Sequence, residues 1–218
     1  TSSVRANPTA GFSIVKAPIT SSGGTIGHGL NASPGMLILK NIGSSSTNWV
    51  IWHSSFSTND YILLNSTSAK ANSVNLFNGN SSTTFTVGSG FAAGTADYIC
   101  YCFAPVSGYS AFGKYTGNSS SDGVFVNTGF RPAWLMVKST NATGSWSIFD
   151  NKRDPFNVMD RFIYAEQNFA EQDSDTVDFV SNGFKLRTGG GDHNYSGRDY
   201  VYIAFAKNPF QANGGLAR

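Results

Sequence analysis

The sequence has few charged residues, few cysteines and no long apolar run. Asp, Glu, Lys and Arg make up 13% of its 218 residues, about half the usual share, and the 15 basic and 13 acidic residues are scattered. Without a basic cluster, a surface that neutralises nucleic-acid phosphates is not expected. No apolar run approaches the roughly 18 residues that cross a bilayer, so we expect no membrane insertion. Residues 1–8 also lack the charged and apolar segments of a signal peptide.

The two cysteines, Cys100 and Cys102, stand two residues apart. On a strand their side chains would point to the same face in parallel, which does not suit a disulfide. No further Cys or nearby His completes a metal-binding set, so we expect no metal and no cofactor. We interpret both cysteines as small buried apolar residues.

Catalytic patterns are also missing. The three histidines are widely spaced (His28, His53 and His193), and no Gly-x-Ser-x-Gly step occurs between a strand and a helix. Glycoside hydrolysis needs two carboxylates roughly 5–10 Å apart, but the two glutamates, Glu166 and Glu171, have no aligned partners elsewhere. We therefore predict that the protein is not an enzyme. Because aspartates could replace glutamates, a polysaccharide-cleaving enzyme is kept as a remote alternative.

Glycines and aromatic residues are plentiful: the chain has 24 Gly, 17 Phe and 9 Tyr. Short apolar runs recur between Gly-, Ser- and Asn-rich turns, and no segment keeps a helical period. This pattern predicts an all-β protein with six or seven short strands in each half.

The two halves repeat each other. Residues Pro34–Lys40 match Pro132–Lys138, and the segment from Trp49 to His53 matches the segment from Trp146 to Asp150. The sequence therefore predicts a tandem duplication of an antiparallel β-sandwich of about 100 residues, lectin-like or jelly-roll-like, with copies at 1–106 and 107–218. The alternative is one large two-sheet sandwich built from both halves. Trp49 and Trp146, at matched positions, are interpreted as core anchors.

The copies differ most in a loop near the end of the second copy. Matching Thr86–Phe91 with Phe179–Phe184 leaves six steps from Phe91 to Asp97 but fifteen from Phe184 to Asp199. The additional residues predict a ligand-binding loop on a flexible glycine base, because loops on a rigid β-scaffold commonly carry binding. The alternative is a solvated hairpin tip. The candidate ligand-binding side chains are Asp192, His193, Asn194, Tyr195 and Arg198.

A second difference lies between Asp150 and Asp160, where charge is densest. Arg153, Asp154 and Asn157 are candidate ligand-binding residues there. Asp150, Asp154 and Asn157 could also supply oxygens to calcium. Lys152 and Arg153 would repel a cation, however, and ion pairs with the aspartates are the simpler interpretation.

Four motifs of the second copy carry a resemblance: Gly129-Phe130-Arg131-Pro132, Trp146–Pro155, Ser181–Arg187 and Tyr202–Phe210. Together they resemble the C-terminal β-rich domains of tail-fibre and related virion proteins of marine and freshwater tailed bacteriophages. The match is strong over residues 108–218 and weaker over the first copy, where His53 replaces the Asp and no Arg-Asp-Pro follows. The resemblance implies a lectin-like sandwich on the virion surface and transfers no catalytic residues.

This resemblance implies a virion structural protein that binds the host-cell surface, and the residue types favour a glycan as the ligand. The alternative is a capsid-decoration or fibre-assembly module without a ligand of its own. The expected partners are other virion proteins and a bacterial surface glycan or receptor. The resemblance alone implies a homotrimer. The expected location is the virion surface, after assembly in the host bacterial cytoplasm.

Overall fold

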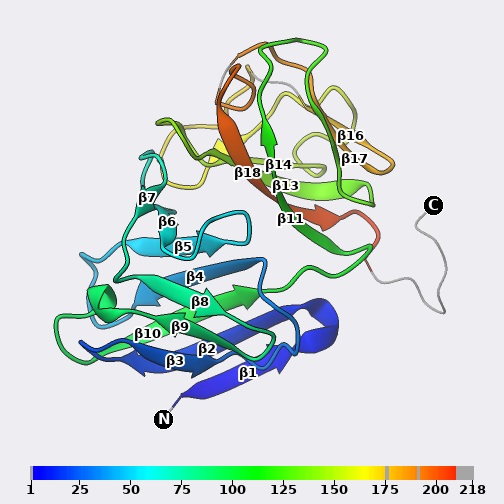
Figure 1. Cartoon of the computed structure of the whole chain (residues 1–218). Helices are drawn as coiled ribbons and strands as arrows, with labels where there is room; N and C mark the ends of the chain where they lie inside the picture. Colours follow the sequence, from blue (N-terminus) through cyan, green and yellow to red (C-terminus); the bar gives the residue numbers. More distant parts are fainter. Residues whose placement is uncertain (1, 175–176, 191, 210–218) are drawn as a thin grey trace. The chain divides into compact units, whose positions relative to one another are not determined.

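A computed structural model describes residues 2–174, 177–190 and 192–209 of the chain (Figure 1). Phe210, the last residue of the fourth motif above, lies outside the described residues. The chain divides into two compact units. The first contains the residues up to Asn65 together with Lys70–Val106, and the second contains Ser66–Ala69 together with the chain from Ser107 onward.

The first unit has two antiparallel sheets. The larger sheet has seven strands in the order β1 (Ser3–Asn7), β2 (Phe12–Ile19), β10 (Ala96–Phe103), β4 (Met36–Asn41), β5 (Trp49–His53), β6 (Asp60–Leu63) and β7 (Ala71–Asn72). The smaller sheet has the order β3 (Gly24–Gly27), β9 (Thr84–Val87) and β8 (Phe77–Asn80). Two short 3-10 helices, η1 (Pro8–Ala10) and η2 (Ser89–Phe91), lie in the connections.

The second unit repeats this plan with fewer strands. Its larger sheet has the order β11 (Ser110–Thr116), β18 (Asp199–Ala206), β13 (Pro132–Ser139), β14 (Ser147–Asp150) and β15 (Ile163–Tyr164). Its smaller sheet has the order β12 (Phe125–Asn127), β17 (Gly183–Leu186) and β16 (Val177–Val180). β2, β10, β4, β5 and β6 therefore have counterparts in the same spatial order, as do the three strands of the smaller sheet.

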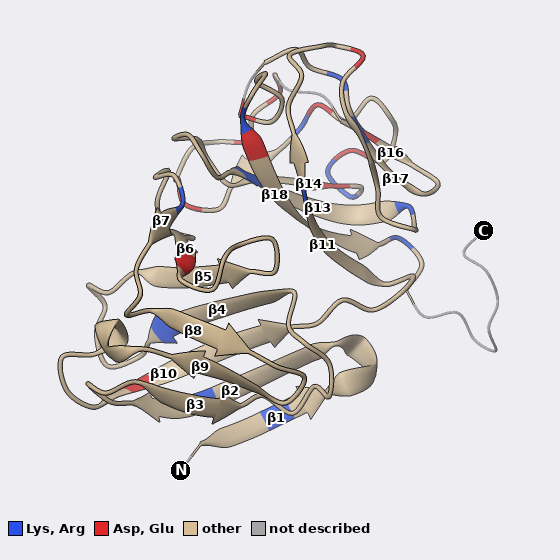
Figure 2. Ribbon diagram, viewed as in Figure 1, with Lys and Arg blue, Asp and Glu red and all other residues tan. Residues whose placement is uncertain are grey.

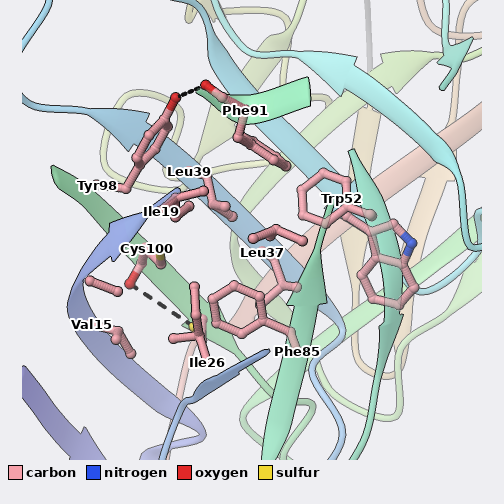
Figure 3. Packing of buried hydrophobic residues seen from close by; sticks show 14 of the residues in the cluster. Val15, Ile19, Ile26, Leu37, Leu39, Trp52, Phe85, Phe91, Tyr98 and Cys100 are labelled. Atoms are coloured by element: carbon pink, nitrogen blue, oxygen red, sulfur yellow. Dashed lines mark hydrogen bonds between the residues drawn. The ribbon is translucent and has the colours of Figure 1, made fainter. Parts of the chain in front are cut away.

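Each unit has its own core between its two sheets. In the first unit, Val15, Leu37 and Cys100 from the larger sheet pack in one buried cluster with Ile26 and Phe85 from the smaller sheet (Figure 3). A separate cluster fills the second unit in the same way. The all-β duplicated sandwich is thus confirmed. The alternative of one large sandwich is not, since each copy builds two sheets and a core of its own.

Alternation along the strands explains the packing. In β2 every second residue is buried, so one face of the strand meets the core while the other carries exposed Lys16. β18 differs because its residues from Tyr200 to Ala204 are buried on both faces. A strand that is apolar on both sides suits the interior of a sheet, and β18 lies between β11 and β13.

The two copies fill equivalent space with different pairs of side chains. In the first unit Val15 lies directly opposite Cys100, and at the equivalent place in the second unit Gly113 lies opposite Tyr202. A Cβ atom added at Gly113 would come within 2.7–2.9 Å of the Tyr202 ring. One copy therefore uses two medium residues where the other uses the smallest and one of the largest, which keeps the interior filled.

The prediction that both cysteines are buried small residues is confirmed. Cys100 and Cys102 are unpaired thiols with no exposed surface, and Cys102 takes the place that Ala204 occupies in the second unit. The predicted role of Trp49 as a core anchor is wrong. Trp52 belongs to the first core cluster, whereas Trp49, three residues away, points to the opposite face and is half-buried. Trp146 is fully buried but belongs to neither cluster.

Charged residues are sparse on both units and are spread along the ribbon (Figure 2). Among the described residues, no helix has the length and apolar character needed to cross a membrane.

The buried cysteines give a chemical test of the core. Burial raises the pKa of both thiols, that of Cys102 to about 12, so native protein at pH 8 should react with neither thiol when treated with a disulfide reagent such as DTNB. Unfolding in guanidinium should make both react at once. A Ser82→Cys variant, with its thiol on an exposed loop, supplies the fast reference rate. Native-state modification at that rate would contradict the buried placement.

His28 makes stability depend on pH. Its ring is fully buried, Nδ1 accepts from the Leu30 N–H at 3.2 Å, and Nε2 lies 3.3 Å from the Ser81 carbonyl oxygen. Burial lowers the pKa of His28 below its usual 6.5, so the unfolded chain takes up a proton first as the pH falls. The free energy of unfolding should therefore decrease as the pH drops below about 6.5.

Threonine is the matched replacement for His28, because Thr128 stands at the equivalent place in the second unit. In denaturant titrations between pH 5 and 8, His28→Thr should show a smaller pH dependence than the native chain. Equal slopes for both proteins would show that His28 does not titrate as described.

Candidate functional site

The predicted ligand-binding loop is shorter than expected. Strand pairing aligns Phe85 with Phe184, because these residues lie opposite Ile26 and Val126 in equivalent sheets. The earlier match of Phe91 with Phe184 is therefore wrong, and Phe91 belongs to η2 instead. The connection that follows β9 covers residues 88–95, and the connection that follows β17 covers residues 187–198. Each connection contributes a buried residue to its sandwich.

Two of the five candidate residues in this loop are buried, which corrects their expected place on a ligand-binding surface. His193 and Asn194 have no exposed surface. The His193 ring packs edge-on against Phe149 and Phe162, with centroids 5.1 and 5.3 Å away, and its carbonyl accepts from the Tyr115 hydroxyl at 2.8 Å.

Asn194 holds three chain segments together. The two hydrogens of its Nδ2 are shared among Asn118 Oδ1, the Ser120 carbonyl and the Thr188 carbonyl, each 2.8–3.0 Å from the nitrogen, and its Oδ1 accepts from the Asn118 N–H at 3.0 Å. A buried amide whose donors and acceptor are all bonded stabilises the loop. The expected flexible glycine base is thus a braced segment, although Gly191 lies outside the described residues.

The other three candidates lie nearer the surface. Asp192 Oδ2 accepts from the Ser145 N–H at 3.2 Å. Tyr195 is 43% exposed, and the Arg198 guanidinium lies 4.3 Å from the centroid of its ring, a cation–π contact. Binding by this loop stays a prediction that depends on Tyr195 and Arg198.

The side chains of the second candidate loop are engaged in its own fold. Arg153 pairs with Asp150 at 3.3 Å and with Glu171. Asp154 Oδ2 accepts from the N–H groups of Asp160 and Arg161 at 2.9 and 2.8 Å. The Asn157 amide bonds both the N–H and the carbonyl of Phe179, each at 3.0 Å, and so extends the edge of β16.

This loop is poorly suited to calcium. Asp150 Oδ1 accepts from the N–H groups of Lys152 and Arg153, and the Asp154 carboxylate is engaged as above. The ion-pair interpretation of this loop is confirmed for Arg153. Within the described ranges, no three His, Cys, Asp or Glu residues gather as a metal site would require.

The structure reveals a different candidate site on the first unit. A surface hollow of about 330 Å³, here called the Trp49 groove, lies over β4, β5 and β10, neighbouring strands in Figure 1. Its apolar lining consists of Ile42, Trp49, Ile99 and Tyr101. Its polar lining consists of Lys40, Asn41, Ser44 and Ser45.

Strand geometry places these side chains together. The core takes Leu39 from β4, Trp52 from β5 and Cys100 from β10, so Lys40, Trp49 and Tyr101 point to the opposite face. Lys40 is directly opposite both Trp49 and Ile99. Across β4 the Trp49 and Tyr101 rings stack, with centroids 6.3 Å apart and planes at 15°.

Lys40 shapes one wall of the Trp49 groove. Its ammonium donates to the carbonyls of Ser44 and Thr47 at 3.2 and 2.5 Å and to the Thr47 hydroxyl at 3.2 Å. These bonds fold the β4–β5 connection over the lysine and fix the wall that carries Ser44 and Ser45. The groove is therefore preformed, with stacked aromatic rings beside hydroxyl and amide groups.

The second unit has no equivalent groove lining. Strand pairing places Ile203 where the first unit has Tyr101, so an aliphatic side chain takes the place of the ring that stacks with Trp49. Lys138, the counterpart of Lys40, is fully buried and donates to the carbonyls of Thr67, Ser68 and Ser139 at 2.9–3.1 Å. Burial lowers the pKa of Lys138 to about 8, against the opposing effect of Glu166 and Asp192.

Two further hollows are less suited to a ligand. One of about 190 Å³ in the first unit is lined largely by Trp52, Phe56 and Phe77, and two of these rings are nearly buried. Another, of about 470 Å³, lies at Asp122 and Arg187 in the second unit. There Asp122 already pairs with Arg187, at 3.7 Å, and with Lys185.

A comparison with protein families finds the family described as Domain of unknown function (DUF7483), which matches residues 1–209. The chain belongs to this family. The match spans both units, so the duplicated pair as a whole is the DUF7483 domain. No curated protein and no solved structure matches the chain.

Lys40, Tyr101 and the serines of the Trp49 groove were not predicted from the sequence. The predicted differences between the copies lie in loops, whereas the informative difference, Tyr101 against Ile203, lies within a strand. The pattern from Tyr98 to Phe103, apolar on both faces, was the available sign, because the outward-facing ring needs a covering group.

The structural role of Asn194 can be measured. Asn194→Ala removes a buried amide whose two N–H groups and carbonyl oxygen are all bonded, so the free energy of unfolding should fall by about 3 kcal/mol in urea titrations. Tyr195→Ala, the exposed neighbour, should change it by less than about 0.5 kcal/mol. If both substitutions have similar small effects, the loop is not braced through Asn194.

Proposed function

We propose that this DUF7483 protein is a bacteriophage virion structural protein of the tail-fibre type that binds a glycan on the host-cell surface through the Trp49 groove. The observation that carries the binding function is the stacked pair of Trp49 and Tyr101 in an open, polar-rimmed hollow. The virion assignment is supported by the resemblance of the four motifs of the second copy. The proposed activity is binding without catalysis.

The groove chemistry suits a sugar. A pyranose ring has an apolar C–H face that packs on aromatic rings, and its hydroxyls need hydrogen-bonding groups at the rim. Trp49 and Tyr101 supply the first, while Ser44 and Ser45 supply the second. One such shallow site binds weakly, but a virion carries many copies of its fibre proteins, which raises the apparent affinity.

A second candidate function is a capsid-decoration or fibre-assembly module without a ligand. Its support is the exposure of large apolar side chains on the second unit: Phe156 is 80% exposed, Phe169 62% and Val158 48%. Such residues suit contact with other virion proteins or with further copies of the chain. On the resemblance alone, the expected assembly is a trimer.

Binding should be tested on whole candidate host cells and on an array of bacterial surface glycans. Trp49→Ala should weaken binding roughly tenfold or more through loss of the stacking surface. Tyr101→Ile, which copies Ile203 of the second unit, should have a similar effect while leaving the strand intact. Phe125→Ala, which removes an exposed aromatic ring outside both candidate sites, is the matched control and should bind as the native chain does.

The following outcomes decide between the candidates. If the native chain binds no host and no glycan, while Phe156→Ser disrupts association with virion proteins, the assembly function replaces glycan binding. If cells are bound equally by the native chain and by Trp49→Ala, the Trp49 groove is not the site. If Tyr195→Ala abolishes binding while Trp49→Ala does not, the binding site lies in the 187–198 loop instead.

A further inference from the structure

The Trp49 groove has a charge of one sign. Lys40 is the single charged residue among its lining residues, and no carboxylate lines it. Recognition of a neutral sugar commonly uses carboxylate acceptors for the hydroxyl protons of the ligand. The groove instead offers a cation together with the hydroxyls of Ser44 and Ser45, which can donate as well as accept.

The lysine charge is not neutralised by the protein. Among the described residues, no carboxylate forms an ion pair with Lys40. Its ammonium instead bonds the neutral oxygens of Ser44 and Thr47, which leaves the full positive charge in place. Because Lys40 is half-buried, this charge is screened less than that of a free surface lysine.

A row of side chains that runs across the neighbouring strands from Lys40 adds to this charge. Ile99 lies opposite Lys40 on one side and Lys16 on the other, so the three residues stand in a row across β4, β10 and β2. Asp97, the nearest acid on the same face of β10, pairs with Lys16 at 3.1 Å. Two lysines and one aspartate therefore leave the row with a net positive charge.

We propose that the Trp49 groove selects acidic glycans, whose carboxylate, sulfate or phosphate groups lie near Lys40 while a sugar ring packs against Trp49 and Tyr101. This inference rests on the proposed glycan-binding function and adds the substrate class. Because the Lys40 hydrogens already have partners, the selection comes from Coulomb attraction. It is therefore sensitive to salt, unlike the stacking contact.

The experiment uses pairs of polysaccharides that differ only in charge. Acidic capsular polysaccharides, together with polygalacturonate and alginate, are compared in native form and after carboxyl reduction to the neutral sugar. Binding of the full chain is measured by biolayer interferometry at 50 and 300 mM NaCl. The acidic forms should bind at least about tenfold tighter than their reduced partners at low salt, and the ratio should shrink at high salt.

Three variants locate the effect. Lys40→Met should bring the affinity for the acidic form down to that for the reduced form, whereas Lys114→Met, an exposed strand lysine of the second unit, should have no effect. Asp97→Asn should act in the opposite direction and tighten acidic binding, because it leaves the Lys16 charge unpaired. This variant keeps the Asp97 backbone carbonyl, which accepts from the Ile42 N–H of the β4–β5 connection at 3.0 Å, so it tests the charge even if Lys40→Met loosens the wall.

The outcomes separate this inference from the function on which it rests. If reduced and acidic forms bind equally, or if Asp97→Asn leaves their ratio unchanged, the acidic preference is overturned and glycan binding stands. If neither form of any polysaccharide binds, the proposed function itself fails. A preference for acidic forms that survives Trp49→Ala would place the selection outside the groove and overturn the inference.

Discussion

Each unit contains an inner strand that is apolar on both faces, and both faces of such a strand need cover from water. β18 is covered on both faces, because its residues from Tyr200 to Ala204 are buried. β10 is fully covered on one face only, because Tyr98 and Cys100 enter the core while Ile99 and Tyr101 are half-exposed on the other face. Incomplete cover of one strand is thus the physical origin of the Trp49 groove.

A lysine at the same place in both copies shows how one residue type can support different surroundings. Lys40 and Lys138 both end a strand beside a β10-type strand, and both place the ammonium among backbone carbonyls. Lys40 bonds carbonyls of the β4–β5 connection that follows its own strand and stays near solvent, whereas Lys138 is fully buried. A lysine surrounded by carbonyls keeps its hydrogen bonds without a carboxylate, so its charge can act on a ligand where it is accessible.

The fold was largely predictable because, in a duplicated chain, the pattern of each strand occurs twice in the sequence. The pairing of Trp49 with Trp146 and of Cys102 with Ala204 follows from the sequence alone, and strand registers confirm it. The match of Phe91 with Phe184 failed because turn residues are similar and a helical turn such as η2 leaves no periodic pattern. The Trp49 groove was not predictable, since contact between β5 and β10 across β4 depends on sheet order rather than on nearness in sequence.

The assignment of Ser66–Ala69 to the second unit has a consequence for the order of synthesis. This short segment leaves the ribosome with the first copy, yet the lysine that bonds the Ser68 carbonyl follows 70 residues later. The second copy therefore completes its fold around a piece of chain made well before it. A cut at the junction between Val106 and Ser107 would place Lys138 and two of its three carbonyl partners on different polypeptides.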